Sequence, residues 1–325
     1  MTLLRREFMG LAAAAAVAPA WPRFAHALDY PTRPVRLIEG YGAGGTPDLV
    51  SRLIGQWLSA QLGQPFVVEN RNGASGNIAT EAVATAAPDG YTLLTCASAN
   101  PINAALYKKL NFNFMRDIAP VAGLLQVPLV LLTNPSFAPK TLPEFLAYAK
   151  ANPGKINLAT PGTGTPMHVA ADMLKMMTAT DIVEVPYHGP APAYADLLAG
   201  QVQAFIITLP SAMGFIRSNK LRVLAVLSDK RRDVLPDVPT VAEFVPGYEA
   251  AAWDGIGAPA KTPVEIIDKL NKAINAGLAD PQIKGKLIDL GGDPMPMTPA
   301  QFGKFLADET EKWAKVIKFS GAKAE

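Results

Sequence analysis

The feature that most constrains this chain is a regular alternation of short apolar runs and amphipathic stretches over most of its length. The apolar runs are rich in Val, Ile and Leu and are bounded by Gly, Pro or Asn, which favours buried strands. The stretches between them carry apolar residues at helical spacing. Strands that alternate with helices predict an α/β fold built on largely parallel sheets.

The alternation divides into two similar sets of elements and a helical tail. The first set comprises strands at Pro34–Glu39, Phe66–Glu69 and Tyr91–Ala97 and helices at Asp48–Leu62 and Ile78–Ala86. The first helix should end at Gly63 and bury a face made of Leu49, Leu53, Ile54, Trp57, Leu58 and Leu62. The second set comprises strands at Leu129–Leu132, Ile156–Ala159, Ile182–Tyr187, Val202–Ile207 and Leu221–Leu227 and helices at Leu142–Ala151, Met167–Thr178 and Ala191–Ala199. A last strand near Trp253–Ala258 precedes helices expected to begin near Pro263, Pro281 and Pro299.

The order of these elements predicts one domain interrupted by another. Residues 28–128 and 250–325 would form the first domain and residues 129–249 the second, with the C-terminal helices packed back on the first. Two or more chain crossings between the domains would act as a hinge. A hinge between two α/β domains predicts a cleft between them.

The N-terminus has the pattern of an export sequence. Arg5 and Arg6 precede a short apolar run, Met9–Ala18, and a small-x-small cleavage motif ends at Ala27. The paired arginines favour a twin-arginine (Tat) signal peptide, with an ordinary secretory signal peptide as the alternative. We therefore expect a mature chain that begins near Leu28 and resides in the periplasm.

Charge and cysteine content exclude several classes of protein. Removal of the signal peptide, residues 1–27, takes away three of the 30 basic and one of the 28 acidic residues, which leaves 27 of each. Such neutrality argues against nucleic acid as a partner. Cys96 is the single cysteine and lies in an apolar run typical of a buried structural thiol. In the mature chain the only histidines are His168 and His188, so we expect no metal site.

The first glycine-rich loop permits two interpretations. Gly40, Gly42 and Gly45 match G-x-G-x-x-G between a strand and a helix, and Glu69 ends the next strand. This is the context of dinucleotide binding, so an exported NAD(P)-dependent oxidoreductase is an alternative function. Thr46-Pro47-Asp48 argues against it, because these residues would interrupt the loop where the fingerprint requires a helix.

The same loop is better interpreted as an anion site at a helix N-terminus. Unpaired backbone N–H groups and the helix dipole favour negative charge at such a position. A second loop, Thr160–Thr165, has the same character and adds hydroxyl groups. Since each loop follows a strand in a different domain, we expect both to face the cleft and to bind one small anion. Asp48 would cap its helix rather than touch that anion.

Motifs spread over the mature chain resemble those of Bug-type solute receptors, the extracytoplasmic components of tripartite tricarboxylate transporters. They include Tyr30-Pro31-x-Arg33-Pro34-Val35-Arg36, Gly44-Gly45-x-x-Asp48, Ala87-Pro88-Asp89-Gly90-Tyr91-Thr92-Leu93 and Leu235-Pro236-Asp237-Val238-Pro239-Thr240. The resemblance implies a type II periplasmic binding fold, in which a hinge joins two α/β lobes and a ligand cleft lies between them. It further implies a small carboxylate ligand, no cofactor, no catalysis, and membrane permease subunits as partners. We expect a monomer.

Matched position by position, the resemblance assigns ligand contacts to the two loops and to a few strand ends. The residues it implies are Tyr41, Gly42, Gly44, Gly45, Thr46, Ser98, Asn100, Thr160, Gly162, Thr163, Gly164, Thr165, His168, Thr208, Trp253 and Asp254. A structural role is equally open for His168, and Trp253 is better interpreted as packing between the lobes. Departures from the family pattern at Tyr41 and Met167 suggest a ligand that lacks an amino group and is partly apolar or aromatic. A hydrolase is not expected, because no motif places a histidine beside Ser98 or Ser211.

Overall fold

The computed structural model describes residues 29–323, and the chain from Pro31 onward forms one compact unit. The expected signal peptide and its cleavage site lie outside the described residues. Helices and strands alternate as the sequence predicts, which confirms the α/β fold class. In the described part of the chain, no helix combines the length and the apolar character needed to cross a membrane.

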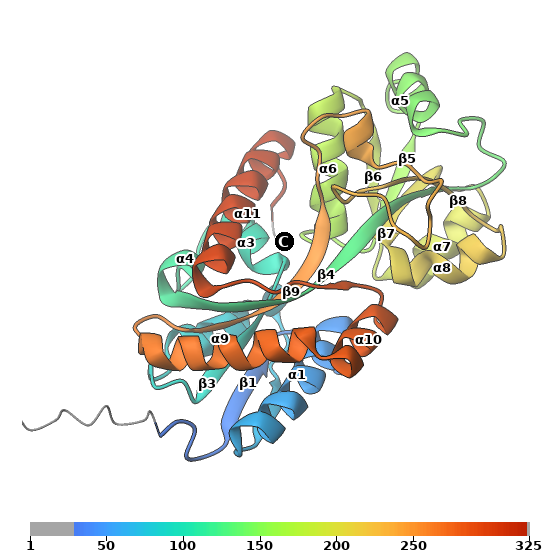
Figure 1. The fold of residues 1–325 in the computed structure, drawn as a ribbon. Coiled ribbons are helices and arrows are strands. Elements are labelled where there is room, and N and C mark those ends of the chain that lie inside the picture. Colours follow the sequence, from blue (N-terminus) through green and yellow to red (C-terminus); the bar gives the residue numbers. More distant parts are fainter. Residues whose placement is uncertain (1–28, 324–325) are drawn as a thin grey trace, which may run out of the picture. The chain divides into compact units, whose positions relative to one another are not determined.

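Two units of the same topology form the two halves of the molecule (Figure 1). In the first half, β1 (Val35–Glu39) lies between two parallel neighbours, β2 (Phe66–Asn70) and β3 (Thr92–Ala97). In the second half, β5 (Asn157–Thr160) likewise lies between β6 (Val183–Pro186) and β7 (Ala204–Thr208). In each half the chain therefore forms the central strand first, then the strand at the outer edge of the sheet, and then the strand nearer the other half.

A helix follows each of these strands. The first half contains α1 (Thr46–Leu62), α2 (Asn77–Ala84) and α3 (Ala99–Leu106). The second half contains α6 (Pro166–Thr178), α7 (Pro190–Leu198) and α8 (Leu209–Arg217), and α5 (Leu142–Ala151) precedes its first strand. α3 and α8 were not predicted from the sequence, because they follow their strands directly, although Pro210 in the first turn of α8 is a helix-start signal.

Two antiparallel strands, β4 (Ile118–Thr133) and β9 (Ala251–Pro259), cross side by side between the halves (Figure 1). β4 pairs with β9 as far as Pro128 and with β7 from Leu129 onward, while β9 also pairs with β3. The strand order is therefore β2-β1-β3-β9-β4-β7-β5-β6, with β8 (Arg222–Val226) and β10 (Asp293–Pro294) also on β4. The sequence predicted only the last part of β4, because the Ala, Pro and Gly residues near its start interrupt the apolar run.

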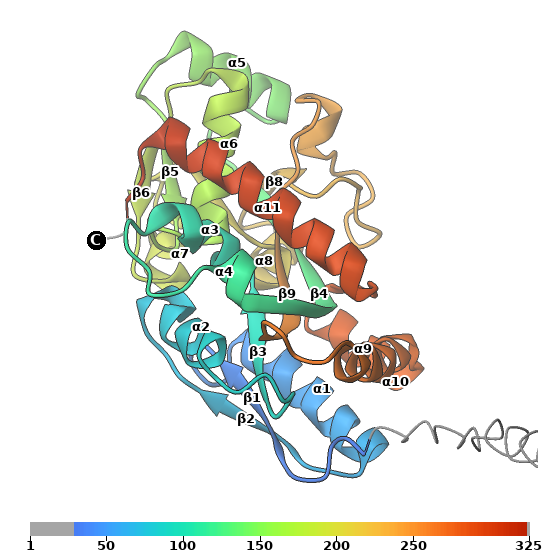
Figure 2. The ribbon, with the colours of Figure 1, turned by 90° about the vertical axis from the view of Figure 1, so that its left-hand side faces the viewer.

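The C-terminal helices start where prolines predicted them. They are α9 (Val264–Ala279), α10 (Pro281–Asp289) and α11 (Pro299–Ser320), and the short α4 (Phe114–Asp117) precedes β4. α11 packs against both α3 and α6, and therefore touches both halves (Figure 2). The buried indole of Trp313 anchors it.

Two details of α1 correct the sequence analysis. The helix begins at Thr46 rather than Asp48, so Thr46-Pro47-Asp48 does not interrupt it and that objection to dinucleotide binding was wrong. Leu49 is 41% exposed, because the buried face is turned toward Val50, Ile54 and Leu58. Cys96 on β3 is a buried free thiol, as predicted.

Gly255 in β9 offers a test of how tightly the crossing strands pack. A Cβ added there would lie 2.9 Å from the Ala122 carbonyl oxygen and would overlap the ring of Phe302. We expect Gly255→Ala to lower the free energy of unfolding by about 1–3 kcal/mol through overpacking. Gly285→Ala is the matched control, because no atom lies within 4 Å of its Cβ and it sits in a helix. Denaturant unfolding of both variants would contradict this packing if Gly255→Ala were as stable as Gly285→Ala.

Candidate functional site

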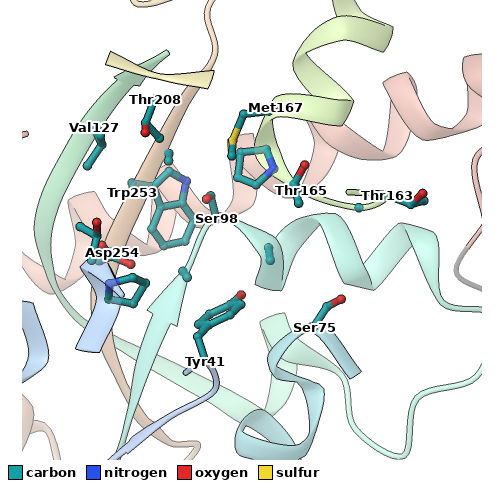
Figure 3. A pocket seen from close by; sticks show the side chains of 17 residues that line it. Tyr41, Ser75, Ser98, Val127, Thr163, Thr165, Met167, Thr208, Trp253 and Asp254 are labelled. Atoms are coloured by element: carbon teal, nitrogen blue, oxygen red, sulfur yellow. The ribbon is translucent and has the colours of Figure 1, made fainter. Parts of the chain in front are cut away.

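A cavity of about 400 Å³ lies where the two halves meet (Figure 3). Its walls come from the β1–α1 loop (Gly40–Gly45) and the β5–α6 loop (Pro161–Thr165), from the ends of β3 and β7, and from the crossing strands. Tyr41 and Asp254 lie on one side of the cavity, and Thr163, Thr165 and Met167 lie across from them. Both halves therefore contribute to one cavity.

Four helices begin at this cavity, two from each half. The lining includes the first turn or the N-cap residue of α1, α3, α6 and α8: Thr46 and Pro47, Ser98 and Ala99, Thr165 and Pro166, and Thr208. Only α6 has a side-chain hydrogen bond at its N-cap, so the other three starts leave their amides without a side-chain cap. Each helix N-terminus carries roughly half a positive elementary charge. The site is therefore electropositive through its backbone.

The two glycine loops have the same backbone geometry. Gly44 and Gly164 both have positive φ, at 84° and 76°, immediately before the N-cap residue. Those N-cap residues, Gly45 and Thr165, have nearly equal backbone angles, and each donates its N–H to the carbonyl three residues earlier. Only glycine adopts such a positive φ without strain, which explains its recurrence at this position.

One side chain from the first turn of each helix holds the preceding loop. Gly44 N–H donates to Asp48 Oδ2 at 2.9 Å, and Gly164 N–H donates to His168 Nδ1 at 3.2 Å. Asp48 therefore binds the loop rather than capping its own helix, which corrects the sequence-based expectation. Its hydrogen bond with Arg52 is the main cause that lowers the Asp48 pKa to about 2, so this acceptor is ionised at neutral pH.

Asn70, at the end of β2, ties the β1–α1 loop to the sheet. Its Nδ2 donates to Glu39 Oε2, to the Tyr41 carbonyl oxygen and to Asp48 Oδ1, at 2.9, 3.2 and 2.9 Å. Glu39 is fully buried and also accepts the Tyr41 N–H at 2.9 Å. This network explains how a loop of small residues can hold one conformation.

The polar side chains in the cavity wall are hydroxyls and one acid. No lysine, arginine or histidine is among its lining residues. Within residues 29–323, five of the serine and threonine hydroxyls have no hydrogen-bond partner, namely those of Thr46, Ser75, Ser98, Thr163 and Thr208. Thr165 differs, because its hydroxyl caps the His168 N–H and donates to the Gly162 carbonyl oxygen. The site thus presents many free donors and no cationic side chain.

Tyr41 and Asp254 also lack a hydrogen-bond partner in this wall. Tyr41 Oη is inaccessible to solvent and has no partner among the described residues. Asp254 is 4% exposed, and burial raises its pKa to about 8, with the charge of Glu39 adding to the effect. Such groups are costly to bury alone and mark a place where a ligand can complete the hydrogen bonding.

Trp253 lines the cavity and is fixed by contacts with α11. Its Nε1 donates to Glu309 Oε2 on α11 at 3.0 Å, and its ring makes edge contacts with Phe302 and Phe305. It is only 2% exposed. Trp253 therefore packs in a core that the first half shares with α11, and it also borders the cavity.

The structure gathers part of the predicted set of ligand residues around the cavity. Nine line it, namely Tyr41, Thr46, Ser98, Thr163, Gly164, Thr165, Thr208, Trp253 and Asp254. Seven lie outside the lining: Gly42, Gly44, Gly45, Asn100, Thr160, Gly162 and His168. Asn100 instead holds the turn after β3, where its Oδ1 accepts the Ala97 N–H at 2.7 Å. Gly162 borders a neighbouring surface pocket together with His188.

Sequence reasoning did not assign ligand contacts to several lining residues. Ser75 follows β2 in a turn, and Val127 and Ala252 face the cavity from the crossing strands. No local pattern marks Val127 or Ala252, since their position depends on how β4 pairs with β9. Pro47 and Pro166 could have been found, because each adjoins a predicted glycine loop, and Met167 had already suggested a partly apolar ligand.

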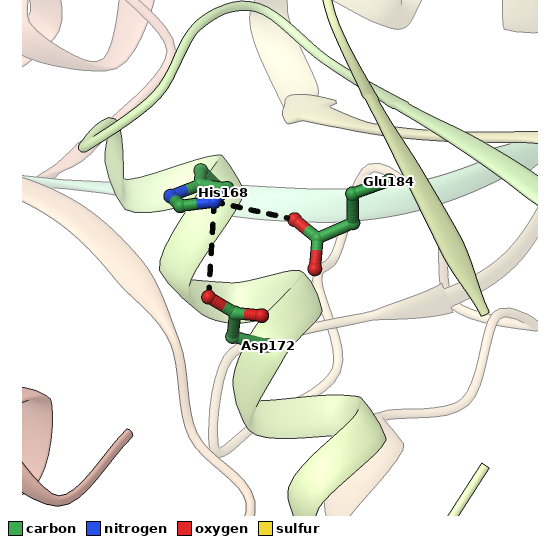
Figure 4. A group of neighbouring side chains, drawn as sticks. All are labelled: His168, Asp172 and Glu184. Atoms are coloured by element: carbon green, nitrogen blue, oxygen red, sulfur yellow. Dashed lines mark ion pairs between the residues drawn. The ribbon is translucent and has the colours of Figure 1, made fainter. Parts of the chain in front are cut away.

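His168 faces a buried charged cluster on α6 and β6 (Figure 4). Its Nε2 lies 3.7 Å from Asp172 Oδ2 and 3.6 Å from Glu184 Oε2. Lys175 Nζ lies 2.8 Å from Glu184 Oε1 and 3.4 Å from Asp172 Oδ1, so one ammonium group pairs with both acids. Because Nδ1 accepts the Gly164 N–H, the imidazole proton is on Nε2, which is thereby blocked as a metal ligand. The cluster is better explained as an ion-pair network that orients His168.

Comparison with known proteins agrees with this geometry. Residues 50–322 match the family model of the tripartite tricarboxylate transporter family receptor. BugT of Bordetella pertussis is 38% identical over 297 residues, which cover 90% of this chain and 91% of that protein. This chain belongs to the tripartite tricarboxylate transporter receptor family. It is therefore a transport receptor rather than an enzyme, and nothing supports the oxidoreductase alternative.

Solved structures extend the similarity to the whole fold of the receptor. A protein of R. palustris solved with adipate is 35% identical with a TM-score of 0.77, and the match covers 90% of this chain and 99% of that one. MatC from Rhodopseudomonas palustris, solved with bound malate, is 33% identical with a TM-score of 0.73, over 89% and 100% of the two chains. The receptor has the two-lobe fold of periplasmic binding proteins, as predicted.

The hydrogen bond from Gly164 to His168 can be tested directly. Burial lowers the His168 pKa below its usual value, which keeps Nδ1 free to accept at neutral pH. We expect His168→Ala to abolish the protection of the Gly164 amide in hydrogen exchange, and His168→Asn to retain much of it because its amide oxygen can accept. His188→Ala is the control, since that histidine is exposed. Equal protection in His168→Ala and the wild type would show that the bond does not hold the loop.

Proposed function

We propose that this receptor captures a small carboxylate in the cavity between its lobes and presents it to the membrane permease of a tripartite transporter. The ligand would be a dicarboxylate or an apolar or aromatic acid. The convergence of four helix N-termini on a cavity without a basic side chain is the observation that carries the proposal.

The electrostatics of the cavity favour an anion. Backbone amides at helix starts bind carboxylates through directed hydrogen bonds as well as through the helix dipole. The five unpartnered serine and threonine hydroxyls add donors that can reorient to suit either a carboxylate or a ligand hydroxyl. A cationic or amino-acid ligand would instead need acceptors and ionised acids, and among the lining residues the only acid is Asp254.

The size and the walls of the cavity favour a small acid with an apolar part. Its volume of about 400 Å³ lies in the lower part of the range for small-molecule sites. Val127, Met167 and Trp253 supply apolar surface between the polar groups. The two relatives described above were solved with adipate and malate, which are both small dicarboxylates.

Closure of the two lobes would complete the site. We assign residues 28–128 and 250–325 to one lobe and residues 129–249 to the other. The change of β4 from pairing with β9 to pairing with β7 after Pro128 supports this boundary. Each lobe supplies two of the four helix starts, so a ligand bound by both lobes gains donors that the open form cannot provide together. That difference would drive closure of a monomeric receptor.

Removal of one hydroxyl should weaken binding of such an acid. We expect Thr208→Val to lower the affinity for malate or adipate by about tenfold or more in calorimetry, because a hydrogen bond to a charged group is lost. Thr85→Val is the matched control, since its hydroxyl is bonded to Glu81 on α2, outside the cavity. Small-angle scattering during the same titration should show a smaller radius of gyration with ligand. Absence of binding by a series of dicarboxylates and aromatic acids, with tight binding of an amino acid instead, would refute the proposal.

Export to the periplasm would precede this function. We propose that residues 1–27 form a Tat signal peptide that is cleaved near Ala27. Replacement of Arg5 and Arg6 by lysines should then retain the uncleaved protein in the cytoplasm, measured by fractionation and by the mass of the exported chain. Normal export of the lysine variant would point to an ordinary secretory signal peptide.

A further inference from the structure

We propose that Asp254 takes part in ligand recognition as a neutral carboxylic acid, donating its proton to a carboxylate oxygen of the bound anion. This inference rests on the function proposed above and adds the chemistry of one contact. Asp254 would then determine whether the site binds an anionic or a cationic ligand.

The position of Asp254 supports such a contact. Its backbone lies in β9, where it pairs with Ala97 of β3 on one side and with Leu125 of β4 on the other. It is held between two strands, is only 4% exposed, and lines the cavity opposite the β5–α6 loop (Figure 3). Its carboxyl group makes no hydrogen bond or ion pair with any residue between 29 and 323. A buried carboxyl without a partner is costly unless a ligand supplies one.

The groups around Asp254 favour its neutral form. Glu39 from β1 is buried nearby and repels a second negative charge, while Tyr41 and Cys96 are buried groups whose own pKa values are raised. No basic side chain lines the cavity to stabilise an ionised Asp254. Burial, with Glu39 as the second cause, raises the Asp254 pKa to about 8, so most molecules carry the proton at neutral pH.

The neutral acid suits an anionic ligand, and the ionised acid does not. A protonated carboxyl donates a short hydrogen bond to a carboxylate, which is among the strongest contacts available between uncharged and charged groups. An ionised Asp254 would repel the same ligand and favour an amine instead. Tyr41 Oη, which also lacks a partner, is a second buried donor in the same wall. The site would therefore select acids over amines without using any basic residue.

The test is a calorimetric titration of the receptor with malate and with adipate from about pH 6.5 to about pH 9.5, where both ligands stay ionised. Wild-type affinity should fall above about pH 8, approaching a tenfold loss per pH unit, because binding then requires uptake of a proton. Asp254→Asn keeps the shape and donates an N–H at every pH. It should bind within several-fold of the wild type at the low end of this range and show little pH dependence.

Proton uptake separates this role from a structural one. Repeating the titration near pH 9 in buffers of different ionisation enthalpy should reveal uptake of about one proton per ligand by the wild type and none by Asp254→Asn. Asp308→Asn is the matched control, because that carboxylate is exposed on α11 and pairs with Lys304. It should behave as the wild type does.

Distinct outcomes overturn distinct claims. Wild-type affinity that is constant up to about pH 9.5, or loss of binding by a folded Asp254→Asn at the low end of the range, would refute the neutral-acid role and leave carboxylate capture intact. Tighter binding of an amine analogue than of the acid would also refute it. Failure of the wild type to bind any carboxylate at any pH would instead overturn the proposed function itself.

Discussion

Four helices start at one cavity because each follows a strand that ends there, and the rest of the site depends on this constraint. β1 and β3 are parallel in one half, and β5 and β7 are parallel in the other, so the carboxyl ends of the inner strands point to the same place. The crossing strands β4 and β9 fix the two halves next to each other. Unpaired amides, which every helix has at its start, are thus concentrated in one volume.

The same kind of hydrogen bond holds both glycine loops, but the side chain that accepts it differs. In both loops, a glycine with positive φ donates its N–H to a side chain in the first turn of the following helix. Asp48 performs this role as an ionised acid paired with Arg52, whereas His168 performs it as a neutral imidazole oriented near Asp172 and Glu184. The same geometry can therefore be kept rigid by an acid in one lobe and by a base in the other.

Recognition without basic side chains has a consequence for selectivity. A lysine or an arginine would attract many anions strongly, whereas amides and hydroxyls require a ligand whose shape places its oxygens at their hydrogen-bonding distance. A buried neutral acid sharpens this requirement, because Asp254 can donate only one proton and repels the ligand once that proton is lost. The helix N-termini thus supply the positive charge that attracts the ligand, and a few unpartnered side chains discriminate between ligands.

The sequence by itself determined most of the helices and strands, the two glycine loops and the family, because periodicity, turn residues and glycines at turns are local properties. It also placed nine residues that line the cavity, since they adjoin strand ends that can be located from the chain alone. Only the tertiary structure revealed that α3 and α8 start at the site and that Val127 and Ala252 line it. It also revealed that Asp48 and His168 accept hydrogen bonds from the glycine loops. These depend on the pairing of β4 with β9 and on burial, which are long-range properties that no sequence window contains.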